Sequence, residues 1–207
     1  MSDLSPLAEK HLKQIASFYD TAKGPSWAGL HYRQMLAQYY NRLIPDSSSV
    51  LEVGCGDGYM LQLLHGESKA GVDISPKQIE RAKQRIPDGQ FYTQAGERID
   101  LEKTYDCIVL PDTINTAGDV QRLFSGLHHV STPRTRLILN VHNNLWRPLF
   151  SLAIWLGLKR KEPESSWRAG SDVQNLLELA DWELVRSSSH ILCPVKIPLL
   201  ASLLNRW

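Results

Sequence analysis

Glycines and a carboxylate at two places in the chain could together hold a nucleoside. The segment VLEVGCGDG, from Val50 to Gly58, places Gly54 and Gly56 directly after an apolar run. Glycines let a backbone approach a ligand closely because no Cβ intervenes. Asp73 ends a second apolar run, and a carboxylate there can accept hydrogen bonds from two vicinal hydroxyls. The pattern predicts a pocket for a nucleoside-containing cofactor at the carboxyl ends of two parallel strands.

The spacing of the glycines separates the possible cofactors. The dinucleotide fingerprint Gly-x-Gly-x-x-Gly needs a glycine where this chain has Tyr59. A pyrophosphate favours free amides without nearby anions, whereas Glu52 and Asp57 flank this turn. A ligand with an ammonium and a sulfonium suits these acidic neighbours better. An NAD site is therefore disfavoured, and a turn that only permits tight packing is the alternative without a ligand.

The turn with its flanking Glu52 and Asp73 resembles the cofactor site of class I S-adenosylmethionine (SAM)-dependent methyltransferases. The resemblance covers about residues 50–192. The segments YDCIVL, TPRTRLILNVHNNLWRPL and DVQNLLELADWELV resemble, more particularly, a bacterial group of uncharacterised methyltransferases that are often associated with glycosyltransferases. The resemblance implies a Rossmann-like methyltransferase fold, SAM as the cofactor and methyl transfer as the reaction.

The resemblance also assigns cofactor-binding roles to residues near the turn. Gly54 and Gly56 would line the methionine portion of SAM. Glu52 would support the turn and the ligand ammonium. Asp73 would take the ribose hydroxyls, and Ile74 would lie against one face of the adenine.

The segments after the third and fourth strands are expected to complete the cofactor site. The family commonly places an Asp on the adenine amino group, and the matching position here is Ala95. Backbone amides of Ala95 and Gly96 could bond the ring instead, and Glu97 could replace the missing carboxylate. Pro111 and Asp112 would lie under the methionine end, where a carboxylate suits an ammonium. A Pro-Asp turn without a ligand is the competing interpretation.

Four further residues are candidates for the site. Cys55 lies within the turn as a small residue that fits there. Tyr19 and Tyr32 belong to N-terminal helices that commonly cover the cofactor in this family, although an aromatic core between two helices would explain them too. His142 follows the fifth strand and is the candidate catalytic base, which a hydroxyl acceptor would need. The competing interpretation of His142 is a loop-packing histidine.

Hydrophobic periodicity and turn residues predict an α/β fold with a doubly wound, mostly parallel sheet and N-terminal lid helices. Ser75 and Pro76 predict a helix start, because serine caps and proline fits the first helical position. The other predicted helices span residues 4–19, 30–43, 58–64, 119–130, 145–158 and 171–179, the last with Ser171 as its cap. The predicted strands span 50–53, 91–94, 105–110 and 135–141, with a second strand ending at 72–74 and a sixth, interrupted one at 182–186 and 190–192.

The length of 207 residues favours a single methyltransferase domain. We expect a helical lid at 1–45, a SAM-binding core at 46–193 and an apolar tail at 194–207. The family's sheet closes with a seventh strand for which no pattern follows. The chain is therefore expected to be truncated before that strand, and a tail packed on the body or on a partner is the alternative.

Composition bounds the partners and the location. The net charge of +1 gives no general attraction to nucleic acid. The three cysteines fit neither a disulfide framework nor metal-ligand spacing, so a cytoplasmic protein without a metal is expected. The longest apolar stretch, LFSLAIWLGL, is too short for a transmembrane helix, and the polar N-terminus is not a signal peptide. Nothing in the sequence indicates an oligomeric state.

These observations predict methyl transfer from SAM to a small-molecule, glycan or lipid-linked acceptor, with oxygen as the expected acceptor atom. A glycosyltransferase is a possible partner because of the group that the chain resembles. The alternative is a non-catalytic module that binds SAM or S-adenosylhomocysteine. Ala95 at the adenine position and the missing last strand are the features that favour this alternative. An NAD-binding enzyme is the third interpretation.

Overall fold

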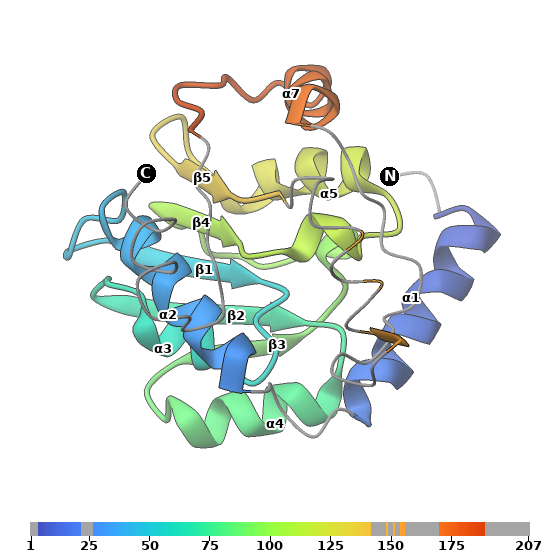
Figure 1. Cartoon of the computed structure of the whole chain (residues 1–207). Helices are drawn as coiled ribbons and strands as arrows, with labels where there is room; N and C mark the ends of the chain where they lie inside the picture. Colours follow the sequence, from blue (N-terminus) through green and yellow to red (C-terminus); the bar gives the residue numbers. More distant parts are fainter. Residues whose placement is uncertain are drawn as a thin grey trace.

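The fold is centred on a parallel β-sheet. The computed structural model describes residues 4–21, 27–141, 148, 151, 154–155 and 170–188. Its five strands lie in the order β3-β2-β1-β4-β5 with every neighbouring pair parallel, which confirms the predicted α/β fold (Figure 1). The strands are β1 (Ser49–Val53), β2 (Ser68–Asp73), β3 (Gln90–Thr93), β4 (Cys107–Leu110) and β5 (Arg136–Leu139).

Helices and short 3-10 turns connect the strands. Most lie within a few residues of their predicted bounds, and α2 begins three residues earlier than expected. The α-helices are α1 (Pro6–Asp20), α2 (Trp27–Asn41), α3 (Tyr59–Leu63), α4 (Pro76–Arg85), α5 (Val120–Gly126) and α7 (Gly170–Leu179). The 3-10 helices are η1 (Gly96–Arg98), η2 (Thr113–Asn115) and η3 (Leu127–Val130).

The start of α4 confirms the predicted cap. The Ser75 hydroxyl accepts a hydrogen bond from the Gln78 amide at 3.2 Å, and Pro76 takes the first helical position. An N-cap serine satisfies one of the N–H groups that a helix leaves unpaired at its start. This cap fixes where β2 ends and α4 begins, directly beside Asp73.

The sheet separates two hydrophobic clusters. Successive residues of a strand point to opposite faces. Leu51 and Val53 therefore pack with Phe124 of α5 on one face, whereas Val50 packs with Leu61 of α3 on the other. Both faces of β1 are covered, which explains its nearly continuous apolar sequence. The sheet is thus a rigid base for the loops at its edges.

The order of the strands places a crevice at their carboxyl ends. The chain runs outward from β1 to β2 and β3, then returns to β4 on the other side of β1. Ligands of doubly wound sheets bind at this reversal. Helix α1 stands beside these ends (Figure 1). Leu4, which precedes the helix, and Ala8 and Leu12 of α1 pack against Ile74 and Ala95, so α1 covers the side of the crevice next to β2 and β3.

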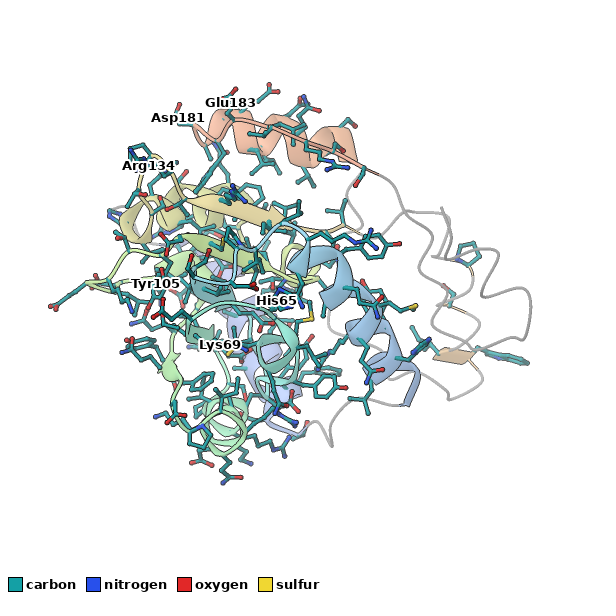
Figure 2. All side chains as sticks on the ribbon, turned by 90° about the vertical axis from the view of Figure 1, so that its left-hand side faces the viewer. His65, Lys69, Tyr105, Arg134, Asp181 and Glu183 are labelled. Atoms are coloured by element: carbon teal, nitrogen blue, oxygen red, sulfur yellow. The ribbon has the colours of Figure 1, made fainter. Side chains whose placement is uncertain are left out.

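The opposite edge of the sheet carries the amino ends of the strands. Figure 2 views the molecule from this edge, where Lys69, Tyr105 and Arg134 lie. The Lys69 ammonium donates to the Gln62 carbonyl at 3.2 Å, and burial lowers the pKa of Lys69. Residues of this edge are suitable controls for substitutions at the crevice.

The predicted sixth strand at 182–186 is wrong. Residues 182–188 form no strand, and Val185 is 89% exposed. Asp181 has a positive φ of 59°, which turns the chain after α7. Trp182 then donates from its indole to the Phe124 carbonyl at 2.9 Å and stacks on His128. Trp182, the first residue of the predicted strand, is therefore held by α5 and η3.

Other expectations about the C-terminal part have different outcomes. Ser171 lies inside α7, whose first residue is Gly170, so it is not the predicted cap. Residues 190–192 and the tail at 194–207 lie outside the described residues, as does most of the predicted helix at 145–158. The division into lid, core and tail stays a prediction. In the part of the chain that the structure describes, no helix is both long and apolar enough to cross a membrane.

Candidate functional site

The glycine turn is built by three residues with positive φ. Gly54, Gly56 and Gly58 have φ values of 77°, 52° and 75°. Side chains other than glycine rarely adopt this region. The amides of Gly54 and Cys55 donate to the Val72 carbonyl at 2.7 and 3.0 Å, which ties the turn to β2. The turn therefore lies between the ends of β1 and β2.

The three glycines face different surroundings. An added Cβ at Gly54 would lie 2.7 Å from the Thr113 hydroxyl oxygen, which itself donates to the Val53 carbonyl. An added Cβ at Gly58 would lie 3.2 Å from Ala82. At Gly56, no described atom lies within 4 Å of that position. Gly54 and Gly58 are needed for packing, whereas Gly56 borders open space that a ligand could enter.

This difference leads to a prediction for two alanine variants. Gly56→Ala should lower the free energy of unfolding by about 1–2 kcal/mol, the cost of a left-handed alanine. Gly54→Ala should cost more, because the added methyl must also displace Thr113. Urea unfolding of both variants measures the difference. Equal losses of stability would contradict the assignment of Gly54 to packing and of Gly56 to open space.

Asp73 is held by backbone amides from both connections. Its carboxylate accepts from the Gly56 amide and from the Ser75 amide, each at 2.8 Å. Burial raises the pKa of Asp73, and these two donors lower it. The Ser75 hydroxyl donates in turn to Asp20 of α1 at 2.5 Å. A carboxylate fixed in this way has lone pairs left for further donors such as ribose hydroxyls.

Glu52 carries a buried carboxylate oxygen for which the described part of the chain offers no partner. The side chain is 2% exposed, and its Oε2 has no hydrogen-bond partner among the described residues. Burial raises the pKa of Glu52 well above its ordinary value, the Arg33 guanidinium lowers it, and Asp73 and Asp57 raise it again. A buried acceptor without a donor is costly, so this oxygen suggests a cationic or hydrogen-bonding ligand.

Two arginines balance Asp57, and the sequence patterns did not indicate either of them. Arg85 of α4 donates to the Asp57 carboxylate at 2.9 Å and also to its backbone carbonyl. Arg33 of α2 lies 3.6 Å from the other carboxylate oxygen. Asp57 therefore fixes the turn to two helices. The acidic groups of the turn differ: both guanidinium groups bind Asp57, whereas Glu52 Oε2 has no partner within the described ranges.

Asp112 lies at the end of β4 in a hydrogen-bonded cluster. Its Oδ1 accepts from the Tyr32 hydroxyl at 3.0 Å and from the Asn140 amide nitrogen at 2.6 Å. The Tyr40 hydroxyl donates to Asn140 Oδ1 at 2.9 Å. Burial, and then Asp112, raise the pKa of both tyrosines well above the ordinary value, so both remain hydrogen-bond donors. Tyr40 and Asn140 were missed in the sequence, because their pairing depends on the approach of α2 to β5.

The residues expected around the adenine lie near α1. Ile74 and Ala95 are in contact with α1, as described above. An added Cβ at Gly96 would meet Leu123 at 2.8 Å, so Gly96 permits close packing of η1 on α5. Glu97 is 3% exposed, and its Oε1 accepts from the Gly118 amide at 2.8 Å. The structure thus uses this carboxylate to hold the loop before α5, and its adenine role stays a prediction.

The remaining candidates are distributed around the crevice. Tyr19 lies in the last turn of α1, and its carbonyl accepts from the Gln78 side chain at 2.9 Å. Cys55 is buried within the turn, where burial raises the pKa of its thiol well above the ordinary value. The Pro111 carbonyl accepts from the Thr113 hydroxyl at 3.3 Å. His142 lies outside the described residues, so its role as a base stays a prediction.

Within the described ranges, no group of three or more His, Cys, Asp or Glu side chains could hold a metal ion. The chemistry of the described crevice is that of carboxylates, tyrosines and open backbone. It suits a ligand that brings hydroxyls to Asp73 and a positive charge to Glu52.

Comparison with known proteins agrees with this geometry. A family model described as a methyltransferase domain matches residues 29–189. An uncharacterized methyltransferase of Synechocystis sp. is 30% identical over 159 residues, which cover 70% of this chain and 72% of the relative. The malonyl-[acyl-carrier protein] O-methyltransferase of Anoxybacillus flavithermus is 31% identical over 109 residues, or 50% of this chain. The match covers only 40% of that relative's length, and 49% for the Bacillus anthracis protein of the same name.

Solved structures share the fold. Magnesium protoporphyrin IX methyltransferase from Synechocystis PCC 6803, crystallised with bound S-adenosylhomocysteine, has a TM-score of 0.64 at 18% identity. That match covers 85% of this chain and 91% of the other. A SAM-dependent methyltransferase from Thermotoga maritima has a TM-score of 0.61 at 16% identity, covering 86% and 82% of the two chains. At these identities the similarity establishes the fold.

Proposed function

The chain belongs to the methyltransferase domain family, and from this membership we propose that it transfers the methyl group of SAM to an oxygen atom of a small-molecule, glycan or lipid-linked acceptor. The observation that carries the proposal is the orphaned Glu52 Oε2 beside the open glycine turn. A nucleotide pyrophosphate would be repelled there, whereas the ammonium of SAM would be attracted.

The described residues fit SAM. Asp73 is fixed by two amides and can accept from ribose hydroxyls. Gly56 leaves space where a side chain would otherwise lie. Glu52 Oε2 and Asp112 are acceptors on the methionine side, where an ammonium has to be bound. We propose these residues, with the backbone of Gly54, as the parts of the chain that hold the cofactor.

The protein's share of the reaction is orientation and exclusion of water. When bound, SAM supplies a methyl group that its sulfonium makes electrophilic. Helix α1 covers the side of the crevice next to β2 and β3, where Ser75 and Gln78 bond to Asp20 and to the Tyr19 carbonyl. Tyr32 stays protonated and donates its one hydroxyl proton to Asp112, so it would hold this carboxylate in place beside the cofactor. A hydroxyl acceptor would also need a base, for which His142 is our candidate.

The relatives' names favour oxygen as the acceptor atom. Malonyl-[acyl-carrier protein] O-methyltransferases and trans-aconitate 2-methyltransferases act on molecules that carry carboxylate groups. A carboxylate is already deprotonated near neutral pH, so its methylation needs no base. We therefore include small carboxylic acids among the small-molecule acceptors. A glycan or lipid-linked acceptor, a glycosyltransferase partner and a cytoplasmic location are proposals that rest on the sequence.

The test is transfer of labelled methyl groups to a panel of acceptors. Wild-type protein is incubated with methyl-labelled SAM and small carboxylic acids, sugars and lipid-linked saccharides. We expect label in one acceptor class and none with Gly56→Val, whose side chain would fill the open space at the turn. Mild base releases methyl esters but not methyl ethers, which distinguishes a carboxylate from a hydroxyl acceptor.

Two outcomes would contradict the proposal. Tight binding of SAM or S-adenosylhomocysteine without transfer to any panel member would favour the non-catalytic binding module. Calorimetric binding of NAD in place of SAM would contradict the cofactor assignment itself.

A further inference from the structure

Asn140 occupies a central place in the cluster around Asp112. A primary amide has two N–H donors and two lone pairs on its oxygen. Asn140 Nδ2 donates to Asp112 Oδ1 at 2.6 Å and to the Tyr32 hydroxyl oxygen at 3.1 Å. Its Oδ1 accepts from the Asp112 amide at 3.0 Å and from the Tyr40 hydroxyl at 2.9 Å. All four positions are used, so the orientation of the amide is fixed by its partners.

Asn140 holds both the backbone and the carboxylate of Asp112. Asp112 has a φ of 59°, a region that non-glycine residues seldom adopt. Such a conformation persists only when neighbouring groups enforce it, and it often marks a functional position. Asn140 Oδ1 accepts from the backbone amide of Asp112, while Nδ2 of the same side chain donates to the Asp112 carboxylate. One side chain directly after β5 therefore sets where the carboxylate in the loop after β4 points.

Tyr40 completes this arrangement from the helical side. It is 3% exposed, and its hydroxyl reaches Asn140 from α2. Burial, then Asp112 and then Glu52 raise the pKa of Tyr40, so this hydroxyl is close enough to feel both carboxylates. The Tyr40–Asn140–Asp112 cluster thus connects α2 to the segments that follow β5 and β4.

We propose that Asn140, supported by Tyr40, is a positioning residue that aims Asp112 at the ammonium of the methionine portion of SAM. The inference rests on the proposed function, since it requires SAM in the crevice. It predicts that Asn140 strengthens the binding of ligands that carry the amino-acid portion of SAM and has little effect on the binding of the nucleoside portion.

Two ligands separate these ends. S-adenosylhomocysteine carries the amino acid, and 5′-methylthioadenosine has the same nucleoside without it. We expect Asn140→Leu to lower the affinity for S-adenosylhomocysteine about tenfold, which is the effect of a lost hydrogen bond. The affinity for 5′-methylthioadenosine should stay unchanged. Tyr40→Phe should lower the affinity for S-adenosylhomocysteine by a smaller factor. Titration calorimetry of each variant with both ligands measures the effect.

Two controls separate positioning from folding. Asn41→Leu removes an asparagine that bonds the Leu63 carbonyl and the His65 amide away from the crevice, so both affinities should stay unchanged. In an Asp112→Ala background, Asn140→Leu should cause no further loss, because its target is gone. Additive losses in this cycle, equal losses for both ligands, or unchanged affinity for S-adenosylhomocysteine would each overturn the inference. If wild-type protein bound neither ligand, the proposed function itself would fail.

Discussion

Replacing Asp73 with asparagine is expected to weaken SAM binding by about 2–3 kcal/mol, or about 30- to 160-fold. Each ribose hydroxyl would donate to a carboxylate, and such charge-assisted bonds are stronger than bonds between neutral groups. The asparagine also has only one oxygen, whereas Asp73 uses one for Gly56 and the other for Ser75. One of these two amides would lose its acceptor, so stability should fall by about 1–2 kcal/mol as well.

Titration of SAM at a temperature where the variant is fully folded separates the two losses. The matched control is Asp88→Asn, which changes an exposed carboxylate that precedes β3 at the opposite edge of the sheet. This control should bind SAM like wild type. Undiminished SAM affinity in folded Asp73→Asn would show that the ribose does not lie at Asp73.

Replacing Glu52 with glutamine is expected to stabilise the protein while it weakens SAM binding. The carboxylate is buried, and one of its oxygens has no partner among the residues that the structure describes. Burial raises its pKa, and Asp73 and Asp57 raise it further. Glutamine cannot ionise, so the free energy of unfolding should rise by about 1–3 kcal/mol at pH values where the buried wild-type carboxylate is charged. The same change removes the attraction for the ligand ammonium, so SAM affinity should fall about 10- to 150-fold. Such an exchange of stability for function is common at binding sites.

The stability difference between wild type and Glu52→Gln should depend on pH in a definite direction. The folded-state pKa of Glu52 is raised, so the folded protein keeps a proton that the unfolded chain releases above about pH 4.3. Wild-type stability therefore falls as pH rises from this value toward the folded pKa, and the advantage of Glu52→Gln should grow over that window. Thermal unfolding of both proteins at about pH 4 and about pH 8 measures this difference.

Asp106 provides a control in which loss of the carboxylate should change the stability in the opposite direction. It is exposed, and it accepts from the Ser49 amide and hydroxyl at 2.8 and 2.7 Å, which lowers its pKa. Asp106→Asn should therefore lower stability near neutral pH, and this penalty should shrink as pH falls through the lowered pKa. If Glu52→Gln lost as much stability as Asp106→Asn, burial of the Glu52 carboxylate would not be unfavourable as described above.

The parts of the site that local sequence determines could be predicted. The positive φ values of the glycine turn need glycine, so the spacing of Gly54 and Gly56 after a buried strand indicated the turn. Ser75 and Pro76 indicated the helix start that supports Asp73, because a cap depends on residues three positions apart. The alternation of apolar strands and amphipathic helices was enough for the fold class.

The parts that depend on distant residues could not be predicted. Asn140 reaches Asp112 across 28 positions, and Tyr40 reaches Asn140 across 100. No periodic pattern records such a pair. Glu97 was expected at the adenine, but the approach of the loop before α5 engages one of its oxygens with Gly118. The apolar alternation at residues 182–186 suggested a strand, whereas Trp182 packs on η3 instead.

A crystal structure with bound S-adenosylhomocysteine tests the central claim most directly. Our account predicts that both ribose hydroxyls lie within hydrogen-bond distance of the Asp73 carboxylate, with the methionine backbone over Gly56 and its ammonium near Glu52 Oε2. Density for the ligand elsewhere, or a nucleoside that leaves Asp73 and Glu52 without contact, would contradict it.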